Sequence, residues 1–259
     1  MSAGKSFYVT TPIFYVNDVP HIGHAYTEVA ADVLARWHRQ AGDRTWMLTG
    51  TDEHGEKVLR TALGNNTDPK SWTDKLVTES WLPLLETIDI DNQDFIRTTE
   101  PRHERNVQKF LQKLYDTGFI YRGEFEGNYC VGCEEYKTEA DLMPGEGAFA
   151  GQPVCAIHSK PVEKLAETNY FFKLSDPRCI EFLENWTSES GRLQPEVLNK
   201  IKEWFAKDEE GNGGLGDWDI SRDAPYFGIE IPDLPEGSPR KYFYVWLDAP
   251  IGYLASLKN

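Results

Sequence analysis

The sequence has no apolar run that approaches the roughly 20 residues needed by a membrane-spanning helix. At the N-terminus, Thr, Pro and Asn residues interrupt the apolar stretch that starts at Phe7, so no signal peptide is predicted. Internal repeats and long low-complexity segments are also missing. We therefore expect a cytoplasmic protein that makes no membrane contact.

Basic residues and cysteines are both scarce. There are 27 Lys and Arg residues against 42 Asp and Glu, a formal net charge of -15. Such a charge repels phosphate backbones at long range, so composition alone argues against high-affinity binding of nucleic acid. Only four cysteines are present, and in a reducing compartment they are unlikely to form a disulfide framework.

The 259 residues include 40% hydrophobic and 13% aromatic residues, which is enough apolar material for a sizeable core. This composition excludes a disordered, collagen-like or coiled-coil chain. The length fits one large domain or two modest ones.

The first 118 residues alternate between strand and helix patterns. An aromatic and β-branched run over residues 6–16 predicts a buried strand that ends at Pro12. From His24 the period becomes helical, and Val29, Val33 and Trp37 form an apolar face. Further elements follow: a strand at 45–49, a helix ending near residue 64, and helices opened by the prolines at 69 and 101. This alternation predicts an α/β fold with a parallel sheet covered by helices.

The alternation is lost after residue 118, where short aromatic strands, a Cys/His cluster and Gly-rich turns begin. A buried strand is expected again at residues 242–247, with a helix after Pro250. We therefore divide the chain into an α/β domain formed by residues 1–118 and 236–259, interrupted by an inserted module at 119–235. Because a doubly wound sheet needs more βα units than this, either the sheet is unusually small or the chain is a fragment.

The segment His21-Ile22-Gly23-His24 lies between the first strand and the first helix. Ligands bind at this edge of open α/β sheets, where backbone N–H groups at a helix N-terminus favour anions. Gly23 allows a phosphate or an adenine to approach the backbone, and the two imidazoles are suited to donate hydrogen bonds to phosphate oxygens. The structural alternative is a pair of capping histidines, and the four residues alone do not decide between the two.

Two later segments are expected at the same edge of the sheet. In Gly-Thr-Asp-Glu-His-Gly, Asp52 is suited to bind an ammonium group, although a helix N-cap is the more common role for such a residue. In the segment Trp246–Tyr253, the aromatic residues are suited to line an apolar pocket, although aromatic residues at a strand end more often belong to the core.

Cys130 and Cys133 form one pair with two intervening residues, and Cys155 and His158 form another. Two such pairs favour a structural zinc site with four protein ligands over a redox pair or buried free thiols. Cys179 has no partner and is expected to pack in the core.

Together these motifs resemble those of methionyl-tRNA synthetases, a family of class I aminoacyl-tRNA synthetases. The resemblance includes His-Ile-Gly-His and Gly-Thr-Asp-Glu-His-Gly, and it is most specific in Trp-Leu-Asp-Ala-Pro-Ile-Gly-Tyr. The stretches starting at Arg97 and Asp217 are similar as well, so the resemblance covers nearly the whole chain. It implies a Rossmann-like catalytic domain interrupted by a connective-peptide module with a zinc knuckle.

The resemblance also implies roles for individual residues. His21 and His24 would stabilise the ATP phosphates as catalytic residues, with Gly23, Tyr15 and Asn17 completing the ATP site. Asp52 would bind the ammonium group of methionine, and Arg222 would lie near the mouth of the active site. The remaining residues of the methionine pocket would be Ile13, Tyr15, Trp246, Ala249, Pro250 and Tyr253.

The implied reaction is the activation of methionine by ATP, bound with Mg²⁺, followed by transfer to tRNA(Met), in a protein expected to be monomeric. The second signature of the family, Lys-Met-Ser-Lys-Ser, has no counterpart in the sequence, nor does a helical anticodon-binding domain. We therefore expect the N-terminal part of a longer enzyme, inactive by itself.

Three alternatives fit the sequence less well. A nucleotidyltransferase of the same superfamily would lack the cysteine module and the segment 246–253. A leucyl, isoleucyl or valyl enzyme would need a larger insertion for its editing domain. A non-catalytic zinc-binding module would explain the cysteines but not the segments around His21 and Asp52.

Overall fold

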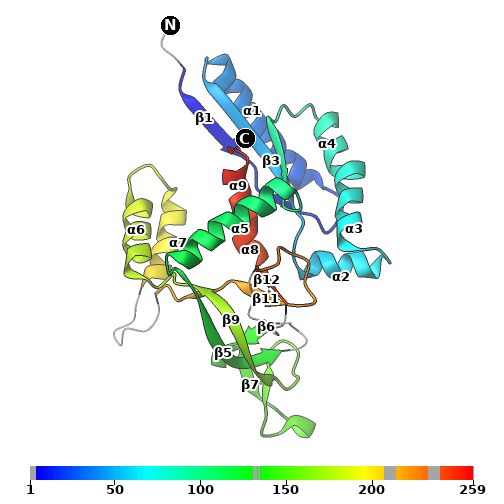
Figure 1. Ribbon diagram of the computed structural model, residues 1–259, viewed down its shortest axis with the longest axis vertical. Coiled ribbons are helices and arrows are strands. Elements are labelled where there is room, and N and C mark those ends of the chain that lie inside the picture. Colours follow the sequence, from blue (N-terminus) through cyan, green and yellow to red (C-terminus); the bar gives the residue numbers. More distant parts are fainter. Residues whose placement is uncertain (1–3, 131–132, 134, 207–213, 233–239, 259) are drawn as a thin grey trace. The chain divides into compact units, whose positions relative to one another are not determined.

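The computed structural model (Figure 1) describes residues 4–130, 133, 135–206, 214–232 and 240–258. The chain divides into two compact units, and each is described by itself. The first unit comprises Met1–Thr117 and Ile220–Asn259, and the second comprises Gly118–Asp219. The expected end of the insertion at residue 235 lies outside the described residues, so that boundary stays a prediction. No helix in the described ranges is long and apolar enough to cross a membrane.

A parallel sheet forms the centre of the first unit. Its strands are β1 (Ser6–Thr10), β2 (Phe14–Tyr15), β3 (Arg44–Asp52) and β4 (Asp94–Arg97). Strand β3 pairs with β1 and β2 along one edge and with β4 along the other, and every pairing is parallel. The predicted α/β fold is therefore confirmed. The expected strand over residues 6–16 is divided at Pro12, because β1 ends at Thr10 and β2 pairs further along β3.

Helices connect these strands. They are α1 (Ile22–Gln40), α2 (Glu56–Gly64), α3 (Pro69–Leu76), a π-helical turn (Val77–Trp81), α4 (Leu82–Thr87) and α5 (Pro101–Asp116). The predicted start of α3 is confirmed, since the Asp68 side chain accepts a hydrogen bond from the Ser71 N–H at 2.9 Å. Residues Phe14, Val16, Leu76 and Trp81 form one of the core clusters.

The buried face of α1 differs from the expectation. Val29, Val33 and Trp37 are 43%, 58% and 63% exposed. The helix instead packs through small residues, Ala31 and Ala35, which cluster with Met47 on β3. Alanine side chains let a helix axis approach a sheet closely, whereas the bulkier stripe does not, and this explains why apolar periodicity alone identified the wrong face.

The last part of the first unit is also different from the expectation. Strands β11 (Ser221–Asp223) and β12 (Lys241–Phe243) form an antiparallel pair outside the parallel sheet. The strand predicted at residues 242–247 is confirmed only for Tyr242 and Phe243, which belong to β12, because α8 begins at Val245 and ends at Asp248. A 3-10 turn (Ala249–Ile251) and α9 (Gly252–Ala255) follow. The apolar run by itself fits a strand or a helix. Burial follows helical spacing here, at Val245, Asp248 and Ala249.

An antiparallel sheet and two helices make up the second unit. The sheet has the order β10-β9-β5-β6, from Trp218–Asp219, Glu163–Phe172, Ile120–Cys130 and Glu135–Lys137. A separate hairpin joins β7 (Leu142–Pro144) to β8 (Pro153–Cys155). The helices are α6 (Pro177–Ser188) and α7 (Pro195–Phe205), and 3-10 turns cover Glu139–Asp141 and Gly147–Phe149.

Candidate functional site

A cavity of about 440 Å³ opens in the first unit at the carboxyl ends of β2 and β3. Its wall contains all seven residues assigned to the methionine pocket from the sequence: Ile13, Tyr15, Asp52, Trp246, Ala249, Pro250 and Tyr253. Three further lining residues were not anticipated: Pro12, Lys57 and Val245. The chain segments that contribute to this wall are thus about 200 residues apart in the sequence, and the fold brings them together.

Asp52, the last residue of β3, is the buried acid of this cavity. Its side chain does not cap α2, because the N-cap of that helix is Gly55. Asp52 is 8% exposed, and its Oδ1 atom has no hydrogen-bond partner among the residues that the structure describes. Burial, reinforced by the charge of Asp248, raises the pKa of Asp52 well above its ordinary value. The backbone N–H of His54 lowers this pKa but leaves Oδ1 unsatisfied. A buried carboxylate oxygen of this kind is a strong site for a cationic group, which would favour the charged form of Asp52.

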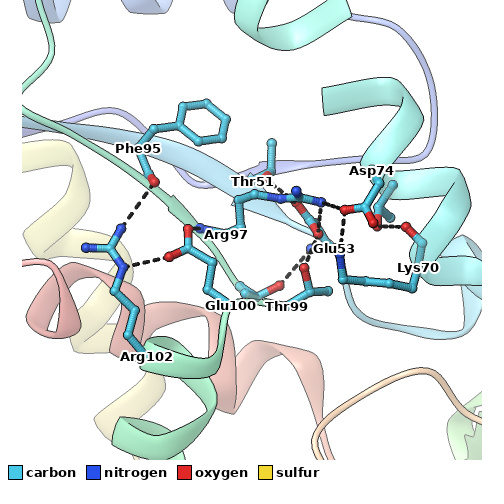
Figure 2. Close-up of polar contacts among 11 residues, drawn as sticks. Thr51, Glu53, Lys70, Asp74, Phe95, Arg97, Thr99, Glu100 and Arg102 are labelled. Atoms are coloured by element: carbon cyan, nitrogen blue, oxygen red, sulfur yellow. Dashed lines mark hydrogen bonds and ion pairs between the residues drawn. The ribbon is translucent and has the colours of Figure 1, made fainter. Parts of the chain in front are cut away.

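The residue next to Asp52 fixes the end of β3 (Figure 2). Glu53 is fully buried, and its two carboxylate oxygens accept hydrogen bonds from Nε and Nη2 of Arg97 at 2.6 and 2.9 Å. Its Oε1 and Oε2 also accept from the hydroxyls of Thr51 and Thr99, and its N–H donates to Thr98. Because these contacts tie β3 to the end of β4, they position the neighbouring Asp52 rigidly.

Asp248, the last residue of α8, is another buried acid of the first unit. Asp248 is 0% exposed, and its Oδ2 atom is 3.1 Å from Nδ1 of His54, while Nε2 of His103 is 3.6 Å from Oδ1. Burial raises the pKa of the Asp248 carboxyl, but the two histidines outweigh that effect and hold it below its ordinary value. An ionised Asp248 therefore anchors α8, which carries Trp246.

The turn His21–His24 begins α1. Nδ1 of His21 accepts the Gly23 N–H at 3.1 Å, and Nδ1 of His24 accepts the His21 N–H at 3.0 Å. The structural alternative of capping histidines is therefore correct for these two nitrogen atoms. Because a neutral imidazole carries one hydrogen, both rings must have it on Nε2, which leaves two Nε2–H donors for another acceptor.

Packing holds the two imidazoles in place. The rings are stacked with centroids 3.8 Å apart, and the His24 ring also contacts Phe14 and Trp81. Burial and the neighbouring His21 lower the pKa of His24, which favours the neutral form. A Cβ atom on Gly23 would lie 2.9 Å from Cε1 of His21, so a side chain at this position would displace that ring.

The cavity and the histidine turn are linked through β2. Neighbouring residues of a strand point to opposite faces, and here Phe14 contacts His24 while Tyr15 lines the cavity. Of the other residues assigned from the sequence, Asn17 is half-buried between β2 and the turn. Arg222 lies on β11 with its guanidinium 4.0 Å from the Tyr244 ring centroid, and neither Asn17 nor Arg222 is part of the cavity wall.

The Cys/His cluster of the second unit is a separate candidate site. The ligand atoms of Cys130, Cys133, Cys155 and His158 all lie within 4.8 Å of one another. The Sγ atoms of Cys133 and Cys155 are 3.6 Å apart, and Nδ1 of His158 is 3.1 to 4.0 Å from the three sulfur atoms. Tetrahedral zinc, with bonds of about 2.3 Å to sulfur and about 2.0 Å to nitrogen, requires spacings near these.

Two thiols of the cluster shift in opposite directions: burial and hydrogen bonds with the thiols of Cys155 and Cys130 raise the pKa of Cys133 to about 11. Burial raises the pKa of the Cys155 thiol, but the backbone N–H groups of His158 and Ile157 outweigh this effect and lower the pKa to about 6. A Cys₃His set of this spacing is the donor set of structural zinc. Val131 and Gly132, between the first two ligands, lie outside the described residues. Cys179 is half-buried on α6 and is not part of the cluster.

The residues that support the site carry no motif for that role in the sequence. Lys57 lines the cavity only because the first turn of α2 passes close to Tyr15. His54 and His103 meet Asp248 across the fold. One pair could have been suspected from the sequence. Arg97 and its partner Glu53 both lie in stretches that are similar to the synthetase family.

The chain is similar to a known protein family over nearly its whole length. The family described as "tRNA synthetases class I (M)" matches residues 7–146 and 145–259. Methionine–tRNA ligase of Streptomyces coelicolor is 52% identical over 98% of the chain, which corresponds to 45% of that relative. The chloroplastic/mitochondrial ligase of Arabidopsis thaliana is 40% identical, again over 98% of the chain, and 38% of its own length is covered.

A solved structure is similar as well. The methionyl-tRNA synthetase of Mycobacterium tuberculosis, in complex with methionyl-adenylate, superposes with a TM-score of 0.75 at 30% identity. The match covers 96% of this chain and 46% of that one, so the chain spans less than half the length of these relatives. Because the family profile matches nearly every residue from 7 to 259, the chain belongs to the class I tRNA synthetases of the methionyl (M) group.

Proposed function

We propose that the cavity beside Asp52 binds L-methionine, and that this chain supplies the amino-acid site of a methionine–tRNA ligase. The observation that carries the proposal is the Oδ1 atom of Asp52, which lies in a largely apolar cavity and has no hydrogen-bond partner in the described ranges of the chain. The α-ammonium group of the substrate pairs with that carboxylate. The thioether lies against Tyr15, Trp246 and Tyr253, since sulfur makes favourable contacts with aromatic rings.

We propose that ATP binds at the histidine turn, together with Mg²⁺. The Nε2–H groups of His21 and His24 donate hydrogen bonds to phosphate oxygens as charge develops there. Gly23 leaves space for the adenine, and Asn17 and Tyr15 complete this site. The carboxylate of methionine attacks the α-phosphorus, pyrophosphate leaves, and methionyl-adenylate forms. No protein nucleophile is needed, because catalysis consists of positioning and electrostatic stabilisation.

The complete reaction adds transfer of the methionyl group to tRNA(Met), which we propose for the longer proteins that share this domain. Arg222 lies near the mouth of the site in this proposal. Zinc bound by the Cys₃His cluster has a structural role, since all four positions are protein ligands. We place the protein in the cytoplasm, where thiols stay reduced, and propose that it acts as a monomer.

One specific observation bears on the alternative of a leucyl, isoleucyl or valyl enzyme. The aromatic wall of the cavity suits an unbranched, polarisable side chain better than a branched one. Isothermal titration of the chain with methionine and with leucine tests this point. We expect methionine to bind more tightly by about 1–3 kcal/mol, and equal affinities for the two amino acids would contradict the proposal.

The proposed ATP site is tested by the rate of ATP–pyrophosphate exchange. The chain contains no Lys-Met-Ser-Lys-Ser segment, which in the family stabilises the charge on the pyrophosphate side. Loss of preorganised charge stabilisation typically costs about 10²–10³ in rate. We therefore expect ATP–pyrophosphate exchange by this chain to be slower by at least that factor than exchange by the Streptomyces coelicolor ligase. Similar rates in the two proteins would show that the catalytic groups of this chain are sufficient.

A further inference from the structure

Lys57 is the unassigned charged residue of the cavity wall. Asp52 and Lys57 are the two charged residues among those that line it, and no ion pair joins them in the part of the chain that the structure describes. Nor does the ammonium group of Lys57 have a carboxylate partner elsewhere among the described residues. The nearest acids in sequence are already engaged, since Glu53 pairs with Arg97 and Glu56 with Arg60.

The position of Lys57 is not explained by the stability of its helix. Lys57 is the second residue of α2, where the positive end of the helix dipole disfavours a cation. The helix is brought to the cavity by Gly55, which has a φ of 109° and a backbone N–H that donates to the Phe227 carbonyl at 2.7 Å. A Cβ atom on Gly55 would lie 2.3 Å from the Tyr15 hydroxyl, so this close approach requires glycine.

From this arrangement we infer that Lys57 binds the carboxylate of the amino-acid substrate, an inference that rests on the proposed function. A free amino acid is a zwitterion, and this cavity offers one carboxylate and one ammonium group that do not neutralise each other. Asp52 takes the ammonium end and Lys57 takes the carboxylate end. A lysine suits this role because its three donors rotate to follow the carboxylate.

The same contact bears on the reaction. The substrate carboxylate must approach the anionic phosphates of ATP, and a cation beside the carboxylate reduces their mutual repulsion. Arg222 is the other candidate for this charge, but it lies outside the cavity wall, and its guanidinium stacks on Tyr244 and donates to the Ser221 carbonyl. Lys57 is therefore a substrate-binding residue for the carboxylate.

The test compares methionine with methioninol, in which an alcohol replaces the carboxylate, by isothermal titration of the 259-residue chain. For the unsubstituted chain we expect methionine to bind about tenfold or more tightly than methioninol, the usual effect of a hydrogen bond between charged groups. In Lys57→Met this preference should fall to near one, with methioninol affinity unchanged. Lys57→Arg should retain part of the preference, because it keeps the charge.

Two further variants provide the controls. Asp52→Asn should weaken methionine and methioninol alike, because both carry the ammonium group. Lys113→Met, an exposed position on α5 outside the cavity, should leave both affinities unchanged.

Each contrary result has a distinct meaning. A preference that persists in Lys57→Met would overturn the assignment of Lys57 while leaving the methionine site intact. Weakened ATP binding in Lys57→Met, with the preference unchanged, would assign the lysine to a phosphate and likewise overturn it. If the unsubstituted chain bound neither compound, the proposed function itself would be wrong, and the inference would fall with it.

Discussion

The Cys₃His cluster and the cavity beside Asp52 differ in how far their polar groups satisfy one another. In the cluster, four ligand atoms all lie within 4.8 Å of one another. In the cavity, a buried carboxylate oxygen of Asp52 has no hydrogen-bond partner within the described part of the chain, and the ammonium group of Lys57 does not pair with it. A closed set of ligands is typical of a structural metal site, whereas unsatisfied charges in an apolar cavity are typical of a ligand site.

The largest effect of a substitution, on metal content and stability, is expected at the Cys₃His cluster. Protein purified without added zinc should contain about one equivalent of the metal, since four protein ligands complete its coordination. Cys155→Ser should lose most of the zinc and destabilise the second unit, because metal binding contributes directly to the folding of such modules. Metal analysis and thermal melting measure the two effects.

Cys179→Ser is the matched control for this experiment. Cys179 lies in the same unit but outside the cluster, so its variant should keep the zinc of the unsubstituted chain. Substoichiometric zinc together with a disulfide between Cys130 and Cys133 would contradict a structural metal site.

A smaller effect, on substrate affinity, is expected at the cavity beside Asp52. Asp52→Ala should weaken methionine binding by about 1.5–3 kcal/mol or more, because the substrate ammonium would be buried without its carboxylate partner. Affinity for ATP should remain nearly unchanged, since the histidine turn is a separate segment. Calorimetric titrations with each substrate measure both quantities, with Asp116→Ala on the surface of α5 as control. Unchanged methionine affinity would leave Asp52 without a binding role.

The first unit contains another buried acid, Glu28, that can be compared with Asp52. Glu28 on α1 is 1% exposed, and burial raises its pKa to about 7 despite a hydrogen bond from Thr49. Unlike Asp52, it does not line the cavity. We therefore expect it to affect stability and its pH dependence, but not methionine affinity.

The sign of this effect follows from proton linkage. The folded state binds the Glu28 proton more tightly than the unfolded state, so the stability it contributes is present below pH 4.5 and is lost as the pH rises through about 7. Glu28→Gln mimics the protonated form at every pH. It should raise the free energy of unfolding at pH 8 by about 1–3 kcal/mol and have little effect near pH 5. Urea titrations at both values measure this, and a less stable variant at pH 8 would refute it.

The sequence was informative where function depends on neighbouring residues. The proposed zinc ligands occur in two short pairs, so their spacing indicated a metal site. The histidine turn occupies four consecutive positions, and the resemblance to the synthetases indicated its role. The parallel sheet followed from the alternation of strand and helix patterns. These features are local, and local signals survive in a linear sequence.

Features that depend on tertiary contacts were not predictable in this way. The stripe of Val29, Val33 and Trp37 has helical period, but the sheet is covered by the alanine face of α1. The aromatic run before Asp248 fits a strand by composition, but residues 245–248 are helical, and Asp248 at the end of this helix contacts the distant His54. Lys57 gave no signal because its role depends on the contact between Gly55 and Tyr15.

The most direct test of the account is a crystal structure of this chain soaked with L-methionine. We predict one methionine in the cavity, with its ammonium nitrogen about 3 Å from Asp52 and its sulfur atom against the rings of Trp246 and Tyr253. An empty cavity at saturating methionine, or a methionine whose ammonium group points away from Asp52, would contradict the assignment of this cavity as the amino-acid site.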